Sequence, residues 1–211
     1  MAIQLQGNGG TVAEVDSTFR AARITIRPQE VINWNSIAGT SGLLTGVAAA
    51  GPVFSFRNTG ANPIIVRRVS LGFYTTTAFT AAQGLAYQMF KATGFTASDT
   101  GGTALYTAGQ NKHRGSFTNI SSAPDIRIST TAALTAGTRT LETVPLAAAC
   151  GSSTGVGTGL PTINLFSHDP GDYPLVLAQN EGFVIANGFA MGAAGVINLQ
   201  TAVEFAEVTS Y

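Results

Sequence analysis

Hydrophobic and polar residues alternate along much of this 211-residue chain, with the period of two that is typical of β-strands. The clearest case is the segment 196–207, where apolar side chains such as Leu199 and Val203 alternate with polar ones. One face of this strand is predicted to lie in a core and the other to face water. The segment 64–73 alternates in the same way, except that Arg67 falls on the apolar side. This position predicts a β-bulge or a buried partner for the guanidinium.

Further strand patterns end at turn-forming Gly, Pro, Asn, Asp or Ser residues. They are the segments 23–27, 53–57, 85–91, 125–129, 162–167, 174–178 and 182–187. About nine strands, joined by long connections such as 93–122 and without a long amphipathic helix, predict an all-β protein. We expect a single β-sandwich of jelly-roll or Greek-key type. The segment 150–161, rich in Gly, Ser and Thr, is predicted to be an exposed, flexible loop.

The chain is expected to form one domain preceded by an arm. Residues 1–19 are polar and glycine-rich, which predicts an extended N-terminal arm, and the β-sandwich domain is expected at 20–211. Terminal arms are poorly ordered unless something holds them. In an assembly, a neighbouring subunit can do so.

The charge content sets this chain apart from an ordinary free enzyme. Only 10% of its residues are charged, 25 are glycine, and the 11 acidic and 11 basic residues cancel. Soluble globular domains carry about 25% charged residues, so we expect other protein to cover part of the surface. Zero net charge argues against a nucleic-acid partner. No apolar run has the roughly 18 residues of a membrane span and no secretion signal is visible, so we expect synthesis in a reducing cytosol and no membrane partner.

Few residues offer catalytic or metal-binding chemistry. The single cysteine, Cys150, follows three alanines and is predicted to be a buried thiol. His168 with Asp169 and Asp172 could bind a divalent cation, but Asp-Pro-Gly-Asp is favoured as a surface turn, and Asp99 is likewise predicted to lie in a turn. We therefore predict no catalytic residue, no metal site and no cofactor. A pair of carboxylates that cleaves glycans is a minor alternative, because sequence separation does not exclude it.

Basic residues form two small groups that are candidates for contact with an acidic partner surface. They are Arg20, Arg23 and Arg27, in or just before the first predicted strand, and Lys112, His113 and Arg114, in a long connection. Arginine suits such contacts because its planar guanidinium binds carboxylates at two points. The favoured interpretation is that these charges lie on solvated faces and protect an edge strand.

Several segments, taken in order, resemble a family of tailed-bacteriophage structural proteins. They are 19–28, 54–58, 66–69, 95–103, 125–129, 136–141 and 173–183, followed by a terminal strand that contains 203–205. The resemblance spans almost the whole chain and implies a virion component, with a capsid decoration or cement protein on the major capsid shell as the leading interpretation. It brings no catalytic residue with it. The expected location is the capsid surface of the virion, after synthesis in the host cytoplasm.

Low charge, strand pattern and resemblance favour one function. We expect a non-enzymatic capsid decoration or cement protein whose partners are the major capsid protein and sister copies in a homo-oligomer, with a trimer as the expected form. The alternative is a tail-associated or host-glycan-binding module that uses the connections 93–122 and 151–161 for recognition. Three aromatic residues near turns could serve a binding face in that case, although core packing is favoured for them: Tyr173, Phe183 and Phe189.

Overall fold

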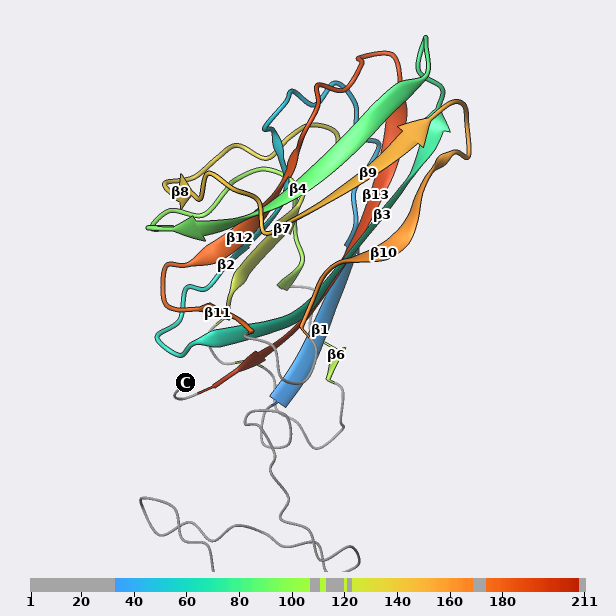
Figure 1. Cartoon of the computed structure of the whole chain (residues 1–211). Helices are drawn as coiled ribbons and strands as arrows, with labels where there is room; N and C mark the ends of the chain where they lie inside the picture. Colours follow the sequence, from blue (N-terminus) through green and yellow to red (C-terminus); the bar gives the residue numbers. More distant parts are fainter. Residues whose placement is uncertain (1–32, 107–110, 113–119, 121–122, 169–173, 209–211) are drawn as a thin grey trace, which may run out of the picture. The chain divides into compact units, whose positions relative to one another are not determined.

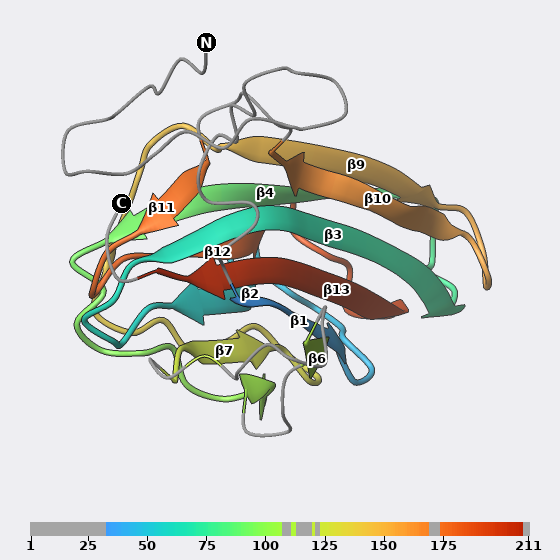
Figure 2. The same ribbon diagram turned by 90° about the horizontal axis from the view of Figure 1, so that it is seen from below.

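The computed structural model describes residues 33–106, 111–112, 120, 123–168 and 174–208. These residues form thirteen β-strands and, within the described ranges, no α-helix (Figure 1). The strands pair into two antiparallel sheets that pack face to face (Figure 2). The predicted arm, 1–19, and the predicted strand 23–27 lie outside the described residues.

The first sheet has the strand order β10-β3-β13-β1-β6, with β11 also paired to β3. Its strands are β10 (Gly159–Ser167), β3 (Ile64–Thr77), β13 (Val196–Glu207), β1 (Asn33–Thr40), β6 (Asn111–Lys112) and β11 (Leu175–Leu177). The second sheet has the order β5-β7-β2-β12-β4-β8, with β9 also paired to β4. Its strands are β5 (Thr103–Ala104), β7 (Asp125–Ile128), β2 (Pro52–Arg57), β12 (Gly182–Asn187), β4 (Gln83–Thr93), β8 (Thr140–Leu141) and β9 (Ala147–Ser153).

The strand order identifies the type of sandwich. Four long strands of one sheet lie in the order β10-β3-β13-β1, and their counterparts in the other sheet in the order β9-β4-β12-β2. Followed along the chain, this is the arrangement of a jelly roll, an eight-stranded double sheet built from two Greek keys. The predicted all-β sandwich of jelly-roll type is therefore confirmed.

Aromatic side chains join the two sheets across the core. Phe56 of β2 meets Phe205 of β13 edge to face, with ring centroids 5.1 Å apart, and Phe73 of β3 meets Tyr87 of β4 at 5.6 Å. Such pairs stabilise a core beyond the burial of their area. The hydroxyl of Tyr87 is buried and has no hydrogen-bond partner among the described residues. Burial raises the pKa of this phenol, because the charged form would lose its hydration.

A β-bulge lies where Arg67 interrupts the apolar pattern of β3. Val66 pairs with Phe205 of β13 and Arg68 pairs with Glu204, so that Arg67 is the extra residue between them. The bulge reverses the alternation, and the apolar side chains before and after it both face the core while the Arg67 side chain is half exposed. The predicted bulge is confirmed, and the expected inward position of Arg67 is corrected.

Two predictions fail around β9 and β10. The segment 150–161 is mostly strand, since β9 ends at Ser153 and β10 begins at Gly159. Cys150 is exposed and not buried. Its neighbour Ala149 faces the core, and strict alternation along β9 turns the thiol outward. Seven small residues form this strand because they pair with β4 along its length, which overrides their weak β-propensity.

Candidate functional site

The structure describes one member of the two basic groups that the sequence singled out. Lys112 lies exposed on β6, opposite Asn35 of β1. The other five lie outside the described residues: Arg20, Arg23, Arg27, His113 and Arg114. The described part of the chain therefore brings no two of these six candidates together, and their contact with an acidic partner stays a prediction.

The described residues contain neither a cluster of metal-binding side chains nor a membrane-spanning helix. No group of three or more His, Cys, Asp and Glu side chains that could hold a metal ion occurs among them. Asp169, Asp172 and Tyr173 lie outside the described ranges. Phe183 lies in the core, as expected, whereas Phe189 is exposed. Within the described ranges, no helix has the length and apolar character that crossing a bilayer requires.

One side of the sandwich presents two strand edges. Among the described residues, β9 pairs only with β4 and β10 only with β3, so each leaves one edge without a ladder partner. The two strands follow one another in the chain and lie side by side (Figure 2). Every second residue of an edge strand points its N–H and C=O away from the sheet, which makes such an edge a template for pairing with another chain.

Exposed aliphatic side chains lie at both ends of β9 and on β10: Val144 and Leu146 precede β9, Val156 lies in the turn between the strands, and Ile163 lies on β10. Seven large hydrophobic residues are exposed in the described structure, and four of them belong to this region: Val144, Leu146, Val156 and Ile163. Val144 and Val156 are 71% and 67% exposed, more than any other large hydrophobic residue described. We call β9, β10 and these four residues the β9–β10 edge. Its small outward side chains on β9, Ala148, Cys150 and Ser152, leave room for a partner backbone to approach.

The β9–β10 edge presents backbone and apolar groups of the kind that take part in protein–protein contacts. Unpaired backbone amides and carbonyls supply hydrogen bonds, and aliphatic side chains supply apolar contact. Full burial of an aliphatic side chain contributes about 1.5–3 kcal/mol. Four such residues therefore offer at most about 12 kcal/mol, which is of the same size as the association cost of about 4–15 kcal/mol. A single contact of this kind is weak, and several linked contacts are needed for firm attachment.

A buried polar cluster at one end of the sandwich was missed from the sequence. Phe95 lies between two guanidinium groups, with Arg139 5.3 Å and Arg57 5.9 Å from its ring centroid. Arg57 donates to Ser98 Oγ and to Asn180 Oδ1, each at 2.9 Å. Burial lowers the pKa of Arg139, because the charged guanidinium loses hydration. These contacts join loops from four parts of the chain, so the cluster stabilises the fold.

Asp99 completes this cluster and confirms the turn predicted around it. Its Oδ1 accepts hydrogen bonds from Arg139 and from the backbone N–H of Gly137. The turn itself contains Gly101 and Gly102 with φ of 78° and 61°, a left-handed conformation that favours glycine. The only available signal in the sequence was that Asp99 and Arg139 are charged in a chain with few charges.

The fold alone leaves the function open, because jelly rolls serve unrelated roles. The geometry adds an exposed double edge with apolar flanks and a buried, structural polar cluster. Comparison with protein-family models, with curated proteins and with solved structures finds no match for this chain.

Proposed function

We propose that this protein is a non-enzymatic virion structural protein, of the capsid decoration or cement type, that binds the major capsid shell. The β9–β10 edge carries the proposal, because it offers the backbone pairing and apolar contact that a structural subunit uses. The low charge content of 10% supports it, as does the resemblance to tailed-bacteriophage structural proteins. Jelly rolls occur in viral capsid domains, which makes the fold compatible with this role.

Weak individual contacts favour an oligomer as the attached form. If each β9–β10 edge contributes only a few kcal/mol, a closed oligomer that engages several capsomers at once gains affinity through effective concentration. We propose a homotrimer, because threefold symmetry places three equivalent edges around a local axis of the shell. Sister copies are then partners in addition to the major capsid protein.

Introducing charge at the edge tests this proposal. In Val144→Glu and Val156→Glu, a carboxylate replaces an exposed methyl-bearing side chain, so the fold should persist while docking loses apolar contact and gains a desolvation cost. We expect each variant to occupy phage particles at a level at least tenfold below that of the native protein, measured by quantitative mass spectrometry of purified particles. Leu43→Glu, at an exposed leucine outside the edge, is the matched control and should attach normally.

Particle imaging provides the second arm of the test. Labelled protein should decorate the whole head, and cryo-EM should show the β9–β10 edge against the shell. Signal at the tail alone would support the tail-associated alternative instead. Particles that lack the protein altogether, together with a stable monomer in solution, would reject the structural role. Equal occupancy of the Val144→Glu, Val156→Glu and Leu43→Glu variants would show that the edge is not the docking surface.

A further inference from the structure

The outward face of the first sheet carries a groove that crosses four strands. Two adjoining hollows, of about 370 and 350 Å³, share Thr162 of β10 and Gln200 of β13 in their linings. One extends over β3 and β10 and the other over β13 and β1. Three strand spacings of about 4.8 Å separate β10 from β1, so the groove spans about 14 Å. Each hollow falls within the size range of ligand pockets.

Strand register explains why the surface is hollowed here. Thr40, Gln200 and Gly72 lie side by side on β1, β13 and β3. On β10, Pro161 and Thr162 together oppose Gly72, so that β10 bulges at this point. A Cβ on residue 72 would lie 2.9 Å from Thr162 Cα, and only glycine permits this close approach. Thr162 occupies the space that a side chain at position 72 would take, so no side chain projects into the groove from this position.

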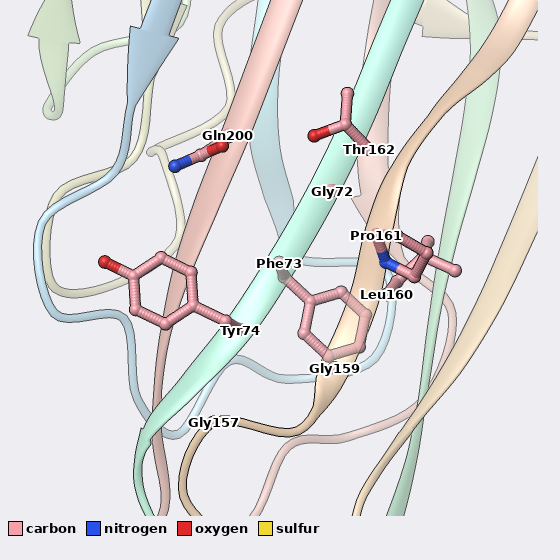
Figure 3. A pocket seen from close by; sticks show the side chains of 9 residues that line it. All are labelled: Gly72, Phe73, Tyr74, Gly157, Gly159, Leu160, Pro161, Thr162 and Gln200. Atoms are coloured by element: carbon pink, nitrogen blue, oxygen red, sulfur yellow. The ribbon is translucent and has the colours of Figure 1, made fainter.

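Polar and aromatic side chains stand around this floor. Gln200 and Thr162 flank the position of Gly72, and Tyr74 follows along the same strand (Figure 3). Tyr74 is 43% exposed. Ala38 of β1 and Ala202 of β13 are paired and line the second hollow, where their short side chains project little from the sheet. The groove thus combines hydroxyl and amide groups with one accessible aromatic ring.

Among the described residues, none of those that line the two hollows is charged, and this selects the class of ligand. A nucleic acid or an acidic polymer requires Lys or Arg at the contact. On the same face of the sheet, Arg68 of β3 and Glu204 of β13 are paired in register and form an ion pair with each other. A protein anchor requires a deep apolar pocket, whereas this groove is shallow and floored by glycine and alanine. Hydroxyl and amide groups beside a phenol ring match a ligand that is uncharged and rich in hydroxyl groups.

We propose that this groove binds a neutral oligosaccharide. Gln200, Thr40 and Thr162 would exchange hydrogen bonds with sugar hydroxyls, and the exposed Tyr74 ring would pack against the C–H face of a sugar. A groove about 14 Å long accommodates a short chain of sugars and not a single ring. The groove shares residues 159–162 of β10 with the β9–β10 edge. The two proposals are tested separately, because Tyr74 and Gln200 lie outside the edge, whereas Val144 and Val156 do not line the groove.

Titration of the isotope-labelled full chain with neutral hexasaccharides tests the proposal. The probes are cellohexaose, laminarihexaose, maltohexaose and mannohexaose, with hexagalacturonate as the acidic control. We expect at least one neutral probe to shift the backbone amide signals of Gly72, Thr162 and Gln200 in a saturable manner. The acidic probe should leave these signals unchanged. Absence of saturable shifts with all four neutral probes, or binding of hexagalacturonate alone, would overturn the proposal.

Substitutions in the groove assign the binding to it. Tyr74→Ser and Gln200→Ala should each weaken the affinity for the bound probe about tenfold, as expected for one lost contact. Phe189→Ser is the matched control, since Phe189 is exposed but lies outside the groove, and it should bind like the native protein. Amide spectra away from each substitution verify the fold. Unchanged affinity in both groove variants, or groove signals that shift with protein concentration alone because a second copy fills the groove, would refute the assignment.

Discussion

Asp99 and Arg139 form an ion pair inside the loop region of the sandwich, 40 residues apart in the chain. The side chains are 0% and 5% exposed, and the same carboxylate oxygen also accepts a hydrogen bond from the N–H of Gly137 at 2.8 Å. Arg139 in turn stacks on the ring of Phe95. A charge pair so far from water costs hydration. The ion pair, the Gly137 N–H and the Phe95 ring offset part of this cost, while Asp99 Oδ2 and Arg139 Nε have no hydrogen-bond partner among the described residues.

Removal of one member of this pair should be strongly destabilising. Arg139→Ala leaves the Asp99 carboxylate buried without its cation, and we expect the free energy of unfolding to fall by about 3–5 kcal/mol. Urea denaturation, followed by the emission of the single tryptophan, Trp34, measures this change. Arg68→Ala is the control, because Arg68 is half exposed and its pair with Glu204 should contribute less than about 1 kcal/mol. Similar losses in the two variants would contradict the structural role of the buried pair.

Tyr87→Phe should stabilise the protein. The hydroxyl of Tyr87 is buried without a hydrogen-bond partner in the described structure, and removing it relieves a desolvation cost of about 1 kcal/mol or more. Thermal and urea unfolding at neutral pH measure the gain. Tyr74→Phe, at an exposed tyrosine, is the matched control. A loss of stability in Tyr87→Phe would reveal a partner for the hydroxyl.

The same phenol predicts a loss of stability at alkaline pH. Burial raises the pKa of Tyr87 in the folded protein, whereas the unfolded chain ionises near its ordinary value of about 10. The unfolded state therefore releases its proton first, and stability that is present below about pH 10 is lost as the pH rises above it. Native protein should lose up to about 1.4 kcal/mol per pH unit more than Tyr87→Phe in this range. Parallel pH profiles for the two proteins would contradict the raised pKa.

Cys150 offers a direct probe of the β9–β10 edge. Because its thiol is exposed in the described structure, the folded protein should react with one equivalent of an aromatic disulfide reagent without denaturant. Reaction only after unfolding would contradict this placement. On assembled particles we expect the reaction to slow at least tenfold, since the docked edge excludes the reagent. Equal reaction rates for free and particle-bound protein would place the interface elsewhere.

Deletion of residues 1–19 tests the arm that the sequence predicts. We expect attachment to particles to fall while the sandwich, which the structure describes from Asn33 onward, stays folded. Particle occupancy by mass spectrometry and the emission of Trp34 report the two properties separately. Unchanged occupancy would reject the role of the arm, and loss of the folded Trp34 signal would assign these residues to the fold itself.

Local patterning was sufficient to find the strands with strong alternation. The bounds of β12 and β13 agree with the predicted segments, and the interrupted pattern at Arg67 located a bulge. These elements were predictable because a strand with one buried face has apolar residues on that face and polar residues on the other, and this alternation is visible in the sequence. Strands made of small or mixed residues, such as β9, lack this alternation and were not predicted.

Only the tertiary structure shows which segments that are distant in the sequence pair or contact one another. The sequence by itself determined the fold class, the low charge and the core face of the strong strands. Only tertiary pairing decided that Asp99 meets Arg139, that Cys150 faces outward, and that Gly72 lies between Gln200 and the bulge of β10. Alternation with a period of two indicates which face of a strand is buried, but it does not indicate which other strand pairs with it. Neighbours in a jelly roll are set by long-range pairing, and both candidate surfaces arise from that pairing.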